Sequence, residues 1–115
     1  MNPKRLLDIA TGAALSRLAQ CQKWKLGAAG IRKDGVLVTS FNGNPKEPEW
    51  TAHAESRLCK KLTPNSVIAV VRVGQGGEWQ LAKPCPSCQR CLKRVGVKRV
   101  YYSIAPNEYG CLDLL

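Results

Sequence analysis

The chain has few acidic residues, a single histidine and no long hydrophobic run. Its 115 residues include 8 Asp and Glu, compared with 18 Lys and Arg. No uninterrupted apolar run is long enough to cross a bilayer, which argues against a membrane protein. The basic N-terminus is followed early by Asp8, so we expect no secretory signal and a cytoplasmic protein.

The basic residues outnumber the acidic ones by enough to give a formal net charge of +10. This excess favours a partner that carries phosphate, either a nucleotide or a nucleic acid. A solvated basic surface without such a partner is the alternative. Hydrophobic residues make up 44% of the chain, so a core can form. We expect a single domain over residues 1–115.

Hydrophobic spacing and turn residues predict helices that alternate with strands. Helices are expected over residues 4–20, 53–62 and about 85–95, the last ending at Gly96. Strands are expected over residues 27–31, 36–41, 67–73 and 97–104, with an Asp-Gly turn between the first two. Residues 42–50 contain Gly and Pro and are expected to form a loop.

This order of elements predicts an α/β fold. The first two strands would form an antiparallel hairpin, and the strands of the second half would be parallel. The tail after Ala105 is too short for another unit of this kind, so the sheet is expected to stop after its fourth strand.

Two short motifs contain the residues that a metal site needs. His53-Ala54-Glu55 opens the second predicted helix, and Pro84-Cys85-Pro86-Ser87-Cys88 opens the third. One imidazole and two thiolates provide three zinc ligands and leave the fourth tetrahedral position to water. The start of a helix also favours thiolates. An open zinc site indicates catalysis, because structural zinc sites usually have four protein ligands.

Glu55 lies two positions after His53, so its side chain points away from that ligand on a helix. It would lie beside the metal without binding it. A carboxylate there can take a proton from water and return it to a substrate nitrogen. The alternative is that His53 is an ordinary packed imidazole. The two cysteines at ligand spacing favour its role as a metal ligand instead.

The pattern His-x-Glu followed by Pro-Cys-x-x-Cys resembles the zinc-dependent cytidine and deoxycytidylate deaminase superfamily. Residues 21–45 look like the hairpin and Asn-Gly-x-Pro loop of deoxycytidylate deaminases. Residues 51–55 are similar to the matching stretch of tRNA adenosine deaminases. The resemblance, which runs from about Cys21 to Tyr102, implies a three-layer α/β/α fold with a mixed sheet. Together with the small size of the chain, it also leads us to expect a homo-oligomer.

The resemblance also implies roles for individual residues. Those that would hold Zn²⁺ are His53, Cys85 and Cys88, and the residue that would transfer protons is Glu55. Asn42 would hydrogen-bond the sugar, and Ala54 would present its backbone to the base. Trp50 lies just before the histidine motif and is expected to line the pocket wall.

Two positions depart from the family pattern. Many deoxycytidylate deaminases have Asn where this chain has Arg57, which leaves the substrate open. Cys91 extends the second motif and could be a fourth ligand in a closed, structural zinc site. On a helix, however, Cys91 lies about 240° around from Cys85, so a role as a core sulfur is favoured. Cys21, Cys59 and Cys111 have no ligand spacing.

Two sets of basic residues have helical spacing, and each would form one face of its helix. The sets are Arg57, Lys60 and Lys61, and Arg90, Lys93 and Arg94. If the two helices lie side by side, these faces could follow a phosphate backbone. They could equally be a solvated outer surface, or pair with acidic residues on another subunit. Trp24, Trp50 and Trp79 are candidates for stacking on bases.

These observations together predict a zinc-dependent enzyme that converts cytosine to uracil in a free (deoxy)cytidine nucleotide such as dCMP. One alternative is a deaminase that acts on nucleic acid, either single-stranded cytosine or tRNA adenosine. Another, of a different class, is a non-catalytic, zinc-stabilised module that binds nucleic acid.

Overall fold

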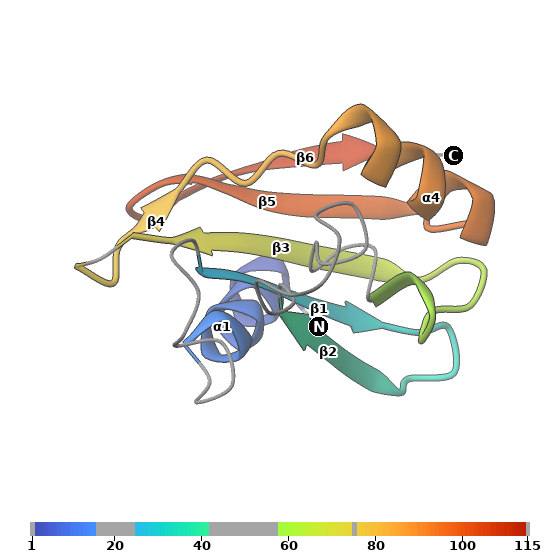
Figure 1. The fold of residues 1–115 in the computed structure, drawn as a ribbon. Helices are drawn as coiled ribbons and strands as arrows, with labels where there is room; N and C mark the ends of the chain where they lie inside the picture. Colours follow the sequence, from blue (N-terminus) through green and yellow to red (C-terminus); the bar gives the residue numbers. More distant parts are fainter. Residues whose placement is uncertain (1, 16–24, 42–57, 75, 115) are drawn as a thin grey trace, which may run out of the picture.

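The computed structural model describes residues 2–15, 25–41, 58–74 and 76–114 (Figure 1). Helix α1 spans Pro3–Ala14, and helix α4 spans Pro86–Val95. The strands are β1 (Lys25–Ile31), β2 (Leu37–Phe41), β3 (Val67–Val73), β4 (Trp79–Gln80), β5 (Arg99–Ala105) and β6 (Glu108–Asp113). The predicted strand 67–73 is thus confirmed, as is the C-terminal helix that ends before Gly96, whose φ is 94°.

All six strands belong to one mixed sheet. Its order is β2-β1-β3-β5-β6, and the short β4 pairs with β3. β1 is antiparallel to β2 and β3, whereas β3 and β5 are parallel. The expected N-terminal hairpin and the parallel pair in the second half are therefore both present.

A helix covers each side of this sheet, and β3 separates the two cores. Ile68 and Val70 pack in one hydrophobic cluster with Leu92 of α4. Ala69 and Val71, which alternate with them, pack in the other cluster with Leu7 of α1, among other residues. Figure 1 shows α1 and α4 on opposite sides of the sheet. A strand that is apolar at successive positions can fill both layers, so the three-layer α/β/α prediction is confirmed.

Local capping sets the start of α1. Asn2 is the N-cap, and its side chain accepts a 2.8 Å hydrogen bond from the backbone N–H of Arg5. Pro3 follows at the first helical position, which suits its fixed φ. The helix ends at Ala14, earlier than the predicted residue 20, and residues 16–24 lie outside the described part of the chain.

The turn between β1 and β2 forms where the Asp-Gly pair predicted it. Gly35 has a φ of 89°, which favours glycine. Its N–H donates to the Arg32 carbonyl at 2.9 Å, and the Asp34 carboxylate accepts from the Val36 N–H at 3.1 Å.

The prediction that the sheet stops after its fourth strand is wrong. β6 pairs antiparallel with β5, from Arg99 with Asp113 to Ala105 with Glu108. A parallel strand would need a long crossover, but an antiparallel strand needs only a tight turn. Pro106 and Asn107 provide that turn, and Asn107 has a positive φ of 63°. The short two-residue β4 was also not predicted.

The second predicted helix, 53–62, lies only partly within the described residues. Leu58 and Cys59 are helical, and Lys60 and Lys61 form a turn. The Lys61 N–H donates to the Leu58 carbonyl at 2.8 Å, a tight bond that ends the helix before the predicted Leu62. The predicted loop at 42–50 lies outside the described residues.

Candidate metal site at the start of α4

The two cysteines of the second motif lie on the first turn of α4. Cys85 is the N-cap, with an extended backbone (φ −68°, ψ 162°), and Pro86 follows it near the start of the helix. Cys88, three residues later, is only 3% exposed, whereas Cys85 is half-buried. Residues three apart on a helix share one side, so the sequence places both thiols at one end of the helix.

Hydrogen bonds hold the turn that carries Cys85. The Gln89 side-chain amide donates to the Pro84 carbonyl at 2.8 Å, and the Gln89 N–H donates to the Cys85 carbonyl at 2.9 Å. The Cys85 Sγ lies 3.4 Å from the Ser87 Oγ, and either atom could be the donor. The backbone on both sides of the first thiol is therefore tied to α4.

The charge around this turn suits anionic ligands. The first turn of α4 has no acidic residue, and Lys93 and Arg94 lie in the last turn. Unsatisfied N–H groups at a helix start carry partial positive charge, which favours thiolates. Thiolates are preferred zinc ligands, so Cys85 and Cys88 fit two of the three positions that an open zinc site needs.

The remaining predicted site residues lie outside the described parts of the chain. These are the ligand His53, the proton carrier Glu55 and the substrate contacts Asn42, Trp50 and Ala54. Within the described residues, no three His, Cys, Asp or Glu side chains are grouped to hold a metal. The structure thus positions two of the predicted ligands and leaves the rest as predictions.

Cys91 makes a contact that the sequence did not indicate. Its Sγ lies 3.0 Å from the Sγ of Cys59, and both residues are half-buried. Cys59 packs at the border of the hydrophobic cluster that includes Leu92. The contact of Cys91 with Cys59 beside this cluster agrees with the predicted role of Cys91 as a core sulfur and not with that of a fourth zinc ligand. The two cysteines are 32 residues apart, so no local spacing could have paired them.

The basic residues of α4 face solvent. Arg90, Lys93 and Arg94 are all exposed, as are Lys60 and Lys61 near the end of the preceding helix. The contact between Cys59 and Cys91 brings that helix end against α4. The described members of the two predicted basic faces therefore belong to adjoining segments.

Trp79 is not an exposed aromatic that could stack on a base. It is 9% exposed and packs in the cluster under α1, where its indole N–H donates to the Thr11 hydroxyl at 2.9 Å. The Lys4 ammonium lies 5.2 Å from its ring centre. Trp24 and Trp50 lie outside the described residues. No helix in the described part of the chain is long and apolar enough to span a membrane.

Comparison with solved structures shows the same fold in several deaminases. The cytidine deaminase from Burkholderia pseudomallei aligns with a TM-score of 0.71 and 21% identity over 99% of this chain and 94% of that chain. The cytidine deaminase from Mycobacterium leprae has a TM-score of 0.62 and 25% identity, covering 96% and 93%. The dCMP deaminase from the cyanophage S-TIM5 has a TM-score of 0.58 and 23% identity, covering 89% and 84%.

Sequence comparison identifies the family of the chain more specifically than the shared fold does. A search of curated proteins gives no match. The family model of the cytidine and deoxycytidylate deaminase zinc-binding region, however, matches residues 1–104. This match covers both motifs and most of the sheet. The chain therefore belongs to the cytidine and deoxycytidylate deaminase family, whose members are nucleobase deaminases with a zinc-binding region.

Proposed function

We propose that this protein is a zinc-dependent hydrolase that converts cytosine to uracil in a free (deoxy)cytidine nucleotide such as dCMP. The observation that carries the proposal is the placement of Cys85 and Cys88 together on the first turn of α4. The family model of the zinc-binding region matches residues 1–104, a range that contains this turn.

The proposed metal ligands are Cys85, Cys88 and His53. When bound, zinc acts as a Lewis acid that makes water a strong nucleophile at neutral pH. Three protein ligands leave one position for that water. The helix start supports the two thiolates, and the hydrogen bond from Gln89 to Pro84 holds the turn that presents Cys85.

Glu55 is the proposed proton carrier. Its carboxylate takes a proton from the attacking water and passes it to the ring nitrogen next to the amine-bearing carbon. The second proton of that water, which remains on the hydroxyl group added to the carbon, passes through Glu55 to the amine, so that the carbonyl forms as ammonia departs. Asn42 hydrogen-bonds the sugar, Ala54 contacts the base through its backbone, and Trp50 lines the pocket.

A free nucleotide is the proposed substrate because residues 21–45 resemble the hairpin and loop of deoxycytidylate deaminases. The positive charge of the chain suits the phosphate of such a substrate. We further propose that residues 1–115 are one domain and that the protein is a cytoplasmic homo-oligomer. Size-exclusion chromatography with light scattering tests the oligomer.

A second candidate is deamination within a nucleic acid. The exposed basic residues on α4 and at Lys60 and Lys61 favour it, because they belong to adjoining segments. A polynucleotide held by several phosphate contacts loses affinity steeply as salt rises. The salt dependence of binding therefore separates this candidate from a free nucleotide, which makes few such contacts.

The test is a mass-spectrometric screen for the change from amine to carbonyl. The zinc-loaded protein is offered cytidine, deoxycytidine, their mono- and triphosphates, single-stranded DNA and tRNA. Conversion of dCMP or a related free nucleotide supports the proposal. Conversion only within a polymer supports the second candidate.

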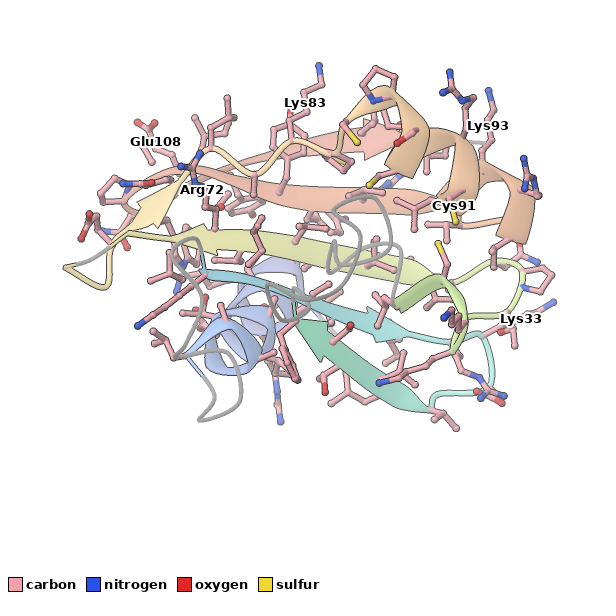
Figure 2. All side chains as sticks on the ribbon, viewed as in Figure 1. Lys33, Arg72, Lys83, Cys91, Lys93 and Glu108 are labelled. Carbon is pink, nitrogen blue, oxygen red and sulfur yellow. The ribbon has the colours of Figure 1, made fainter. Side chains whose placement is uncertain are left out.

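The matched pair of variants for this screen is Glu55→Gln and Glu108→Gln. We expect Glu55→Gln to abolish conversion while zinc stays bound, because the amide cannot accept the proton. Glu108 is exposed on β6, at the far end of the sheet from Lys93 in Figure 2, so its variant should remain active. Zinc without an exchangeable water, together with no conversion of any substrate, would favour the non-catalytic binding module.

A further inference from the structure

Two thiols outside the proposed metal site lie in contact between separate segments. The Cys91 Sγ is 3.0 Å from the Cys59 Sγ. In Figure 2, the Cys91 side chain extends from α4 toward the short helical segment that contains Leu58 and Cys59. Both residues are half-buried, so neither is enclosed completely in the core.

The surrounding packing holds this pair in place. Cys91 is in the middle of α4, next to the fully buried Leu92. Cys59 follows the fully buried Leu58, which belongs to the same hydrophobic cluster as Leu92. Each thiol is thus attached to a backbone that is fixed by a neighbouring core residue. The two sulfurs face each other as a result of the fold, since 32 residues separate them.

We propose that Cys59 and Cys91 form a reversible disulfide that cross-links α4 to the helical segment Leu58–Cys59. A disulfide has an S–S distance of about 2.05 Å, so the sulfurs need to approach by roughly 1 Å. Rotation of two side chains that are only half-buried can provide this movement. The inference goes beyond the proposed function and is independent of deamination.

The oxidant is a low-molecular-weight disulfide such as glutathione disulfide. One protein thiolate attacks it, so a mixed disulfide forms and one glutathione leaves as its thiol. The second protein thiolate then attacks the mixed disulfide, which forms the Cys59–Cys91 bond and releases the second glutathione. Two protein thiols are oxidised and one glutathione disulfide is reduced to two thiols. Excess glutathione reverses both steps.

The charge near the pair supports this chemistry. Lys60 follows Cys59 directly, and Arg94 lies three positions after Cys91, on the same side of α4; both basic residues are exposed. Glutathione disulfide carries net negative charge, so a basic surface raises its local concentration.

The geometry assigns the cross-link to this pair and not to the proposed ligands. Cys85 is about 240° around α4 from Cys91, on a different side of the helix. Cys88 is 3% exposed, which restricts access to its thiol. Bound zinc would further protect both ligands from oxidation. The disulfide would connect two segments that each follow a proposed ligand motif closely in sequence, and it would restrain them without consuming a ligand.

The experiment uses the zinc-loaded full chain, which is oxidised with glutathione disulfide, quenched with acid, and then alkylated after denaturation in the presence of a chelator. We expect the number of alkylated cysteines to fall by two from the six in the chain. Trypsin should release the linked peptides Leu58–Lys60 and Cys91–Lys93. Their compositions are identical, so fragment ions are needed to establish that both are present. A non-reducing gel should show a monomer, and the melting temperature should rise and then return after reduction.

Single variants provide the controls. Cys59→Ser and Cys91→Ser should each abolish the cross-link and the rise in melting temperature, whereas Cys111→Ser, on exposed β6, should leave both unchanged. A disulfide that involves Cys85 or Cys88, a linkage between chains, or no cross-link in the wild-type protein would overturn the proposal. The wild-type peptide map decides the question even if a serine variant does not fold. Every readout measures thiol chemistry or stability. A failure of the disulfide proposal can therefore be distinguished from an absence of deaminase activity.

Discussion

The Gln89 side-chain amide donates a 2.8 Å hydrogen bond to the carbonyl of Pro84, the residue before the first proposed zinc thiol. Gln89 is half-buried on α4, and its backbone N–H also binds the Cys85 carbonyl at 2.9 Å. One residue thus holds the peptide groups on both sides of Cys85. Groups that orient metal ligands in this way typically affect metal affinity by about 10- to 100-fold.

Replacement of this side chain should weaken zinc binding. We expect Gln89→Leu, which keeps the size but loses the donor, to lower zinc affinity by about 10-fold. Competition with a chromophoric zinc chelator measures the change. Arg90→Leu is the matched control, since Arg90 is the exposed neighbour on the same helix. Equal zinc affinity in Gln89→Leu and wild type would mean that this hydrogen bond does not position Cys85.

Removal of a proposed ligand should cost both metal and stability. Cys88→Ser replaces a thiolate with a hydroxyl, which is a poor zinc ligand, at a site that is 3% exposed. We expect bound zinc to fall close to zero and the melting temperature to drop, because metal binding is coupled to folding. Metal analysis and thermal denaturation measure the two effects. Cys111→Ser should retain the wild-type zinc content, and full zinc in Cys88→Ser would exclude Cys88 as a ligand.

The contact between Thr11 and Trp79 should contribute to stability. The Thr11 hydroxyl accepts from the indole at 2.9 Å and donates to the Leu7 carbonyl at 2.8 Å. Thr11→Val keeps the shape but leaves the indole N–H without this acceptor, so the free energy of unfolding should fall by about 1–2 kcal/mol. Urea denaturation measures the change.

A double-mutant cycle provides the control for this contact. Trp79→Phe removes the donor, so Thr11→Val should cost less in that background than in the wild type. Equal costs in both backgrounds would show that the two side chains are not coupled.

The reactivity of Cys111 should depend on pH in a defined direction. Cys111 is exposed, but partial desolvation of its thiol raises the pKa of that thiol above its ordinary value, and the Asp113 carboxylate raises it further. A raised pKa keeps the thiol protonated, so alkylation of the folded protein should begin at higher pH than alkylation of the unfolded chain. The rate of reaction with iodoacetamide as a function of pH tests this.

Asp113→Asn is the diagnostic variant for Cys111. It removes the repulsive carboxylate and also the partner of Arg99, whose guanidinium lies 2.7 Å from Asp113 and lowers the pKa of Cys111. Both changes should move the alkylation profile to lower pH. Glu108→Gln on the same strand should leave the profile where it was, and a profile that does not move in Asp113→Asn would rule out the role of Asp113.

Much of the fold was predictable because it depends on local patterns. The apolar run at 67–73 predicted β3, the Asp-Gly pair predicted the β1–β2 turn, and Gly96 predicted the end of α4. The placement of Cys85 and Cys88 on one helical turn was also predictable. Their spacing and the flanking prolines determine it within a few residues of chain.

Sequence patterns gave a wrong prediction where the same local pattern is compatible with more than one tertiary arrangement. The tail after Ala105 is too short for a crossover unit, yet it suffices for a hairpin, so β6 was missed. Spacing alone cannot tell whether a strand near the end of a chain pairs with its neighbour. That choice depends on the free edge of β5, which exists only once the sheet has formed.

The sequence by itself determined the family, the two ligand motifs and most element types, because each depends on residues that are close along the chain. The tertiary structure alone decided that Trp79 is buried under α1, that β6 extends the sheet and that Cys59 meets Cys91. The Trp79–Thr11 and Cys59–Cys91 contacts join residues that are 68 and 32 positions apart. They form because burying apolar surface on both sides of the sheet brings α1, α4 and the strands together, and no local pattern encodes which side chains then meet.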